Sequence, residues 1–114
     1  VELYNNSDET INFDADTWYF ARQANGSTWM SIQLTGSVGV GETYVLSYNS
    51  TAFYDSYAFA ADRNTSAASG NGNDGYFLYH GGNHETGTLI VPELIAGTPT
   101  LLVAVPISDI TLDN

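Results

Sequence analysis

The sequence predicts an all-β domain, because its composition, its turn residues and the alternation of its apolar residues all favour strands. Aromatic and β-branched residues are common, whereas Lys, Arg, Gln and Met, which favour helices, are nearly absent. Clusters of Asn, Gly, Asp and Ser divide the chain into short apolar runs, as expected for a β-sandwich. The length of 114 residues suits one core. We therefore expect a single domain over residues 1–114.

The first half of the chain is expected to form five short strands. The clearest prediction is a hairpin, because a run in which Met30, Ile32 and Leu34 alternate with polar residues follows the turn residues 25–27. The alternation indicates one buried face and one face in contact with water. In chain order, the five expected strands cover residues 1–5, 10–13, 18–23, 28–34 and 43–48.

The strand expected at residues 43–48 alternates as well. Tyr44 and Tyr48 are predicted to share one face with the leucine between them, and Val45 and Ser47 are predicted to share the other. This strand is therefore expected to place its two tyrosines on one face of the sheet and Val45 on the other.

The next part of the chain has a weaker pattern. Residues 51–61 are rich in aromatic side chains and alanine but have no clear period, so we expect an irregular segment or a single helical turn. A polar loop at residues 62–74 contains several residues that adopt positive φ readily. Strands are then expected at residues 76–80 and 86–91.

A continuously apolar run near the carboxyl end departs from the alternation. A strand in which every residue is apolar must be buried on both faces. Either it is a central strand of a sheet, or another molecule covers it. The run consists of Leu101, Leu102, Val103, Ala104 and Val105.

The charge of the chain excludes several classes of partner. Thirteen acidic residues face only Arg22 and Arg63, and the formal net charge is −11. Such a surface repels nucleic acid and anionic membranes, and no apolar run is long enough to span a bilayer. An acidic surface without lysine also resists trypsin-like proteases, which favours an extracellular or cell-surface location. Because the chain begins at Val1, we expect either a processed mature protein or an excised domain.

No catalytic residue is predicted. The chain has no cysteine, which excludes disulfides and thiol chemistry, and it contains no nucleophile motif such as Gly-x-Ser-x-Gly. Its carboxylates cluster in turns, whereas a glycosidase needs an acid whose pKa is raised by apolar surroundings. We therefore expect no enzymatic activity.

Two kinds of metal site are weighed. His80 and His84 with Glu85 would suit zinc on a helix, but the glycines between the histidines favour the end of a hairpin instead. Calcium is the stronger candidate cofactor, because two loops place oxygen ligands at alternate positions. Ordinary tight turns use the same residues, and we favour that interpretation. The candidate calcium ligands are Asp14, Asp16, Asn71, Asn73 and Asp74.

The sequence offers two kinds of candidate carbohydrate site. Four Asn-x-Ser/Thr sequons lie in expected turns or loops and are candidate N-glycosylation sites, although Asn is also a common turn residue. Exposed aromatic side chains are candidates for a glycan-binding platform, unless a tryptophan fills the core. The sequons are at Asn5, Asn25, Asn49 and Asn64, and the aromatic candidates are Trp18, Trp29, Tyr54 and Tyr57.

Five segments, at residues 1–7, 18–20, 25–29, 43–46 and 70–79, follow one another in an order that resembles the lamin tail domain. This family is an immunoglobulin-like β-sandwich that also occurs in secreted bacterial and archaeal proteins. The most specific element is the Gly-Asn-Gly-Asn-Asp run that leads into an aromatic strand. Beyond Ile90 the chain departs from the family, which usually continues into a Trp-bearing strand and a closing Arg.

The resemblance implies an immunoglobulin-like sandwich of about seven to nine short, mostly antiparallel strands and a non-enzymatic role. The first hypothesis is an extracellular structural or adhesive module, in which the apolar strand completes the sheet of a neighbouring copy. The alternative is an accessory domain that attaches a larger secreted enzyme to a glycan or a surface. The expected partners are other copies of the chain, surface proteins or glycans.

Overall fold

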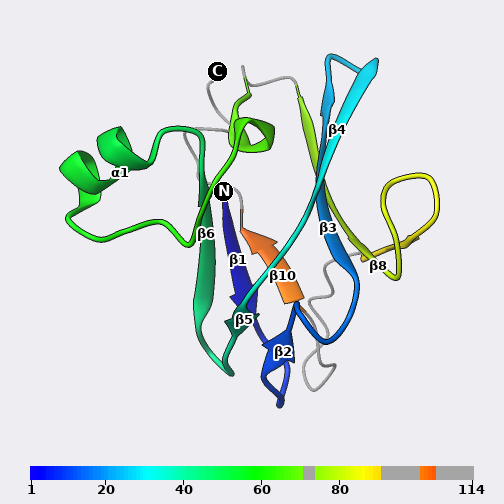
Figure 1. Cartoon of the computed structure of the whole chain (residues 1–114), viewed down its shortest axis with the longest axis horizontal. Helices are drawn as coiled ribbons and strands as arrows, with labels where there is room; N and C mark the ends of the chain where they lie inside the picture. Colours follow the sequence, from blue (N-terminus) through cyan, green and yellow to red (C-terminus); the bar gives the residue numbers. More distant parts are fainter. Residues whose placement is uncertain (71–73, 91–100, 105–114) are drawn as a thin grey trace.

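The computed structural model describes residues 1–70 and 74–90, together with the backbone of residues 101–104. Within these residues the chain is mostly β, in agreement with the predicted fold class (Figure 1). In chain order the elements are β1 (Glu2–Asn5), β2 (Ile11–Asn12), β3 (Trp18–Ala24), β4 (Thr28–Gln33), β5 (Ser37–Val38), β6 (Thr43–Ser47), α1 (Ser50–Tyr57), β7 (Arg63–Asn64), the 3-10 helix η1 (Ser66–Ala68), β8 (Gly75–His80), β9 (Thr88–Leu89) and β10 (Leu101–Ala104).

The described strands form three sheets. One four-stranded sheet has the order β10-β1-β6-β7, another has the order β4-β3-β8-β9, and β2 pairs with β5. Each described pair is antiparallel except β6 with β7, which is parallel. The predicted preference for antiparallel pairing is therefore confirmed within these residues.

The predicted hairpin is present as β3 and β4, and its turn has a local cause. Asn25 has φ of 49° and Gly26 has φ of 71°, and the Ser27 N–H donates to the Ala24 carbonyl over 2.8 Å. Two central residues with positive φ define a type I′ turn, whose twist matches that of the flanking strands. The Asn-Gly dipeptide therefore forms the turn, and the ladder begins with Ala24 opposite Thr28, so Ser27 is an additional loop residue on the β4 side.

Both four-stranded sheets contribute to one core. Leu3 of β1 and Leu46 of β6 pack in the same buried cluster as Phe20 of β3 and Leu78 of β8. Phe20 and Leu78 also lie opposite each other across the β3–β8 ladder. Burial raises the pKa of the Tyr44 phenol in this cluster. The buried cluster consists of Leu3, Phe13, Phe20, Leu34, Val38, Tyr44, Leu46, Ala67 and Leu78.

β6 ends one residue before the predicted strand does, and the predicted alternation did not indicate how deeply it is buried. Both faces are buried, since Val45 and Ser47 are as inaccessible as Tyr44, while Tyr48 lies beyond the end of the strand and is 62% exposed. Tyr44 and Leu46 belong to the core cluster, and β6 lies in the interior of its sheet, between β1 and β7, with the Asp62 N–H donating to the Val45 carbonyl over 2.9 Å. A strand in the interior of a sheet can be buried on both faces.

The segment expected to be irregular, or a single turn, is the eight-residue helix α1, about two turns long. The Asn49 side chain caps its first turn by accepting from the Ala52 N–H, and Ala58 ends it with φ of 62°. No residue of α1 is buried, and the helix projects from the sheets (Figure 1). A helix without a buried face has no apolar period, which explains why the pattern did not predict its length.

Candidate functional site

The candidate site is the sheet edge formed by β1 and β10, and its foundation is the pairing of β1 with β6. Glu2 lies opposite Val45, and the ladder continues beyond the strand, since the Leu46 N–H donates to the Val1 carbonyl over 2.8 Å. The Val1 ammonium in turn donates to the Leu46 carbonyl over 3.0 Å. This edge of β1 is therefore closed by neighbours within the described fold.

Asn5 anchors the far end of β1. Its side chain is fully buried, and Nδ2 donates to the carbonyls of Glu9 (2.8 Å) and Val38 (2.9 Å). Its Oδ1 accepts from the N–H (2.9 Å) and the hydroxyl (2.6 Å) of Ser7. Because a glycan would be attached to Nδ2, this sequon is incompatible with modification in the folded state. The Asn-x-Ser pattern here forms a buried turn, a function that sequence reasoning missed.

β10 pairs with β1 along the whole length of both strands, with Glu2 opposite Ala104 and Asn5 opposite Leu101. Among the described strands it is the outermost of its sheet, beside β1 in Figure 1. In the described sheet β10 is therefore an edge strand and not the predicted central strand, because the one described partner of β10 is β1. The alternative, that another molecule covers the strand, stays a prediction. Val105, the last residue of the apolar run, lies outside the described residues.

Those candidate calcium ligands that the structure describes make contacts with other groups of the protein. Asp14 accepts from the Gly36 N–H over 3.1 Å, and Asp74 pairs with Arg22 over 3.8 Å. Asn71 and Asn73 lie outside the described residues. In the part of the chain that the structure describes, no group of three or more His, Asp or Glu side chains is placed to hold a metal ion.

The two histidines make separate contacts, and Asp16 is the partner of His80. The hydrogen bond to His80 (2.7 Å) lowers the pKa of the Asp16 carboxyl. His84 instead bonds the Ser31 hydroxyl (2.7 Å) and stacks on Trp29, with ring centres 4.5 Å apart and planes 7° apart. The two histidines therefore do not form a shared zinc site, although their spacing in the sequence raised that alternative.

The aromatic candidates divide into two groups. Trp18 packs against the core, and Trp29 is half-buried against Phe77, with ring centres 5.3 Å apart, on the sheet face expected to contact water. Tyr54 and Tyr57 are 56% and 63% exposed on α1. Of the four aromatic candidates, the two exposed ones are thus on the helix, and the two on predicted strands are half-buried.

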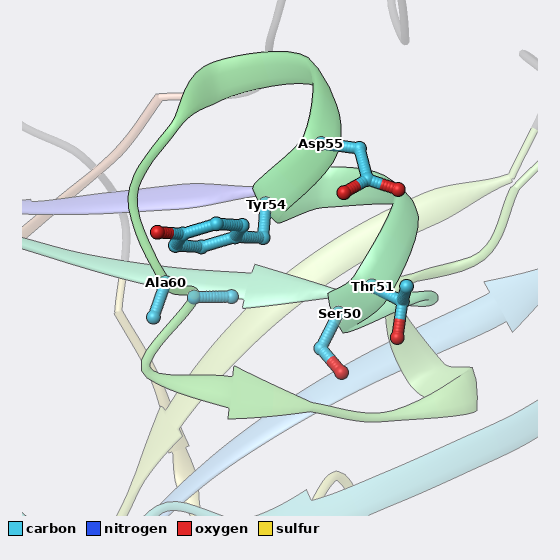
Figure 2. Close-up of a pocket in the computed structure, with 6 residues that line it drawn as sticks. Ser50, Thr51, Tyr54, Asp55 and Ala60 are labelled. Atoms are coloured by element: carbon cyan, nitrogen blue, oxygen red, sulfur yellow. The ribbon is translucent and has the colours of Figure 1, made fainter.

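A hollow of about 350 Å³ lies beside α1 (Figure 2). The Tyr54 ring and the Asp55 carboxyl line it from the helix. The Ser50 N–H, at the start of α1, donates to Asn64 Oδ1 over 2.9 Å, which ties the helix to β7. The lining residues are Ser50, Thr51, Tyr54, Asp55, Ala60 and Ala61.

The remaining sequons are on the surface. Asn25 is exposed in the β3–β4 turn, and Asn49 and Asn64 are exposed near the start of α1. Asn49 and Asn64 line one shallow hollow of about 520 Å³, although they are separated in sequence. Each uses Oδ1 to accept a backbone hydrogen bond, so a glycan on Nδ2 would leave that bond in place.

Comparisons with protein-family models, with curated proteins and with solved structures found no match. The resemblance to the lamin tail domain therefore stays a prediction from the sequence motifs. Among the described residues, no helix has the length and hydropathy that crossing a membrane requires.

Proposed function

We propose that the chain is a non-enzymatic extracellular module, structural or adhesive, that assembles through β-strand addition between β10 and β1. The observation that carries the proposal is the position of β10. It is an edge strand near the end of the chain, and its register with β1 extends from Glu2 opposite Ala104 to Asn5 opposite Leu101. The same four residues from another copy could form the same ladder.

Such an exchange does not change the number or kind of main-chain hydrogen bonds. A ladder between β1 and β10 uses main-chain N–H and C=O groups, so its hydrogen bonds are equivalent within one chain and between two. Without β10, β1 would present unpaired groups at an open edge. The exchange therefore replaces one closed edge by another.

Reach and concentration decide which pairing forms. The ten residues 91–100 connect Ile90 to Leu101, and a chain of that length spans at most about 35 Å. This is comparable with the dimensions of the molecule, 34 × 32 × 27 Å. A strand on its own chain has an effective concentration of about millimolar. We therefore expect closed monomers in dilute solution and exchange at the high local concentration of a cell surface.

The apolar sequence of the run supports assembly. An apolar strand at a sheet edge is prone to aggregate unless something covers it, and a second copy would do so while providing a specific register. The immunoglobulin-like sandwich of the lamin tail type is part of the same proposal. Its support is the single core to which both four-stranded sheets contribute.

Disulfide trapping tests the proposal, because the chain has no cysteine of its own. Glu2→Cys and Ala104→Cys are introduced into separate copies, which are mixed and oxidised at increasing protein concentration. Since these positions lie opposite each other, a disulfide-linked dimer is expected on a non-reducing gel. Glu2→Cys mixed with Leu101→Cys is the matched control, since Leu101 lies opposite Asn5.

Two results would reject strand addition. The first is equal dimer formation by the matched and mismatched mixtures, which would indicate random collision. The second is a monodisperse monomer by light scattering and negative-stain microscopy at every concentration tested.

A further inference from the structure

The helix α1 exposes more aromatic surface than the fold explains. Tyr54 and Tyr57 of the helix and Phe59, two residues beyond its end, are 56%, 63% and 49% exposed, and no residue of the helix is buried. Phe53 contacts Tyr57 and Phe59, with ring centres 4.8 and 5.1 Å away, so part of the group is self-supporting. Tyr54 has no place in that group, and its ring faces the hollow beside the helix.

The hollow combines an aromatic ring with oxygen atoms. Figure 2 shows the Tyr54 ring above Ala60 in that view, with the hydroxyls of Ser50 and Thr51 near the start of the helix. The Asp55 carboxyl adds a strong hydrogen-bond acceptor. The volume of about 350 Å³ is within the range of small-molecule sites.

We infer that this hollow binds a neutral carbohydrate. A sugar ring has an apolar C–H face that packs on an aromatic ring, and hydroxyls at its rim that bond to carboxylates and hydroxyls. The Tyr54 ring, the Asp55 carboxyl and the hydroxyl of Ser50 are the corresponding groups of the protein. The capped ends of α1 and the bond from the Ser50 N–H to Asn64 hold these groups in place.

The charge of the site selects against other ligands. No Lys, Arg or His lines the hollow, and the chain has a net charge of −11, so anionic glycans and phosphates are repelled. Calcium needs six to eight oxygen ligands, mostly carboxylate and carbonyl, whereas Asp55 is the one carboxylate in the lining. A neutral polyhydroxylated ligand fits both constraints.

Titration calorimetry with cello-, manno-, galacto- and xylo-oligosaccharides tests the inference on the intact chain. We expect at least one series to bind, and Tyr54→Ala to weaken binding by about tenfold or more, the scale on which a lost stacking contact acts. Tyr54→Phe keeps the ring and should bind within about threefold of the original chain. Asp55→Asn should weaken binding, because it replaces one accepting carboxylate oxygen by an NH2 donor and removes the charge that strengthens the remaining bond.

Tyr57→Ala is the matched control, because Tyr57 is equally exposed on the same helix but outside the lining. The inference is overturned if no neutral oligosaccharide binds, if Tyr54→Ala binds as well as the original chain, or if Tyr57→Ala causes the same loss. Binding of a proline-rich peptide or an acidic oligosaccharide in place of the neutral sugars would also overturn it. Since the site does not involve β10, its failure leaves strand addition unaffected.

Discussion

The two edges of β1 are bound in different ways. Towards β6, the ladder is extended by bonds between Val1 and Leu46, and Asn5 ties the strand end to two further loops. Towards β10, the described contact is the ladder itself. Ten residues of the sequence separate β10 from Ile90. One edge is therefore built into the core, and the other depends on a strand that enters from the end of the chain. The difference teaches which pairing can be exchanged without unfolding the protein.

Asn5→Ala is expected to have the largest effect, because it acts on the built-in edge. It removes the side-chain bonds to Glu9, Val38 and Ser7, of which the bond to the Val38 carbonyl is fully buried. We expect the free energy of unfolding to fall by about 2–4 kcal/mol, measured by urea denaturation. Asn6→Ala is the control, since Asn6 is exposed. Equal stability of the two variants would mean that Asn5 does not anchor β1.

Proline substitutions in β10 sharpen the comparison at the other edge. Successive N–H groups of a strand point to opposite sides, so only one of Leu102→Pro and Val103→Pro removes a donor to β1. That variant should lose about 1–3 kcal/mol of stability and assemble poorly, whereas its neighbour should lose less. Light scattering and urea denaturation measure the two effects. Identical behaviour of both variants would contradict pairing through this ladder.

The sequence predicted a region correctly where residues close together in the chain determine its structure, and less well where distant residues do. The β3–β4 hairpin was predicted correctly because Asn25 and Gly26 determine its turn locally. The run at Leu101 was correctly predicted to be a strand, but its place at the sheet edge depends on which edge of β1 is free. Apolar character does not encode that choice. The burial of both faces of β6 was not predicted for the same reason, since it depends on neighbours distant in sequence.

The candidate sites were harder to predict than the strands. The Asn5 sequon and the buried Asn5 turn have the same sequence, and only burial distinguishes them. The Asn49 cap is a local signal that could have indicated a longer helix at residues 50–57. The hollow beside α1 could not be predicted, because it also needs Ala60 and Ala61 to return alongside the helix.

Asp62→Ala should have a smaller effect, because it acts on β6, the partner of β1 at the built-in edge, from the side away from β1. Its carboxylate accepts from the Val45 N–H over 2.7 Å, while its own N–H donates to the Val45 carbonyl. The substitution removes the first bond and keeps the second, so we expect a loss of about 0.5–1.5 kcal/mol in urea denaturation. Asp8→Ala serves as the control on an exposed carboxylate. Assembly should be unchanged in both variants, and a selective loss of assembly in Asp62→Ala would show that the two edges are coupled.

The smallest effect is expected from Asp16→Asn, which changes a surface contact away from both edges of β1. The hydrogen bond from His80 holds the pKa of the Asp16 carboxyl below its usual value of 3.8. The contact therefore stabilises the fold above that value, and the stabilisation is lost as the pH falls through the lowered pKa. Urea midpoints of the original chain and of Asp16→Asn should differ slightly at about pH 6 and converge at about pH 2 to 3. A difference that persists in acid would mean that the carboxylate charge is not what stabilises this contact, and a change in assembly would mean that the β1 edges respond to a pair outside their sheet.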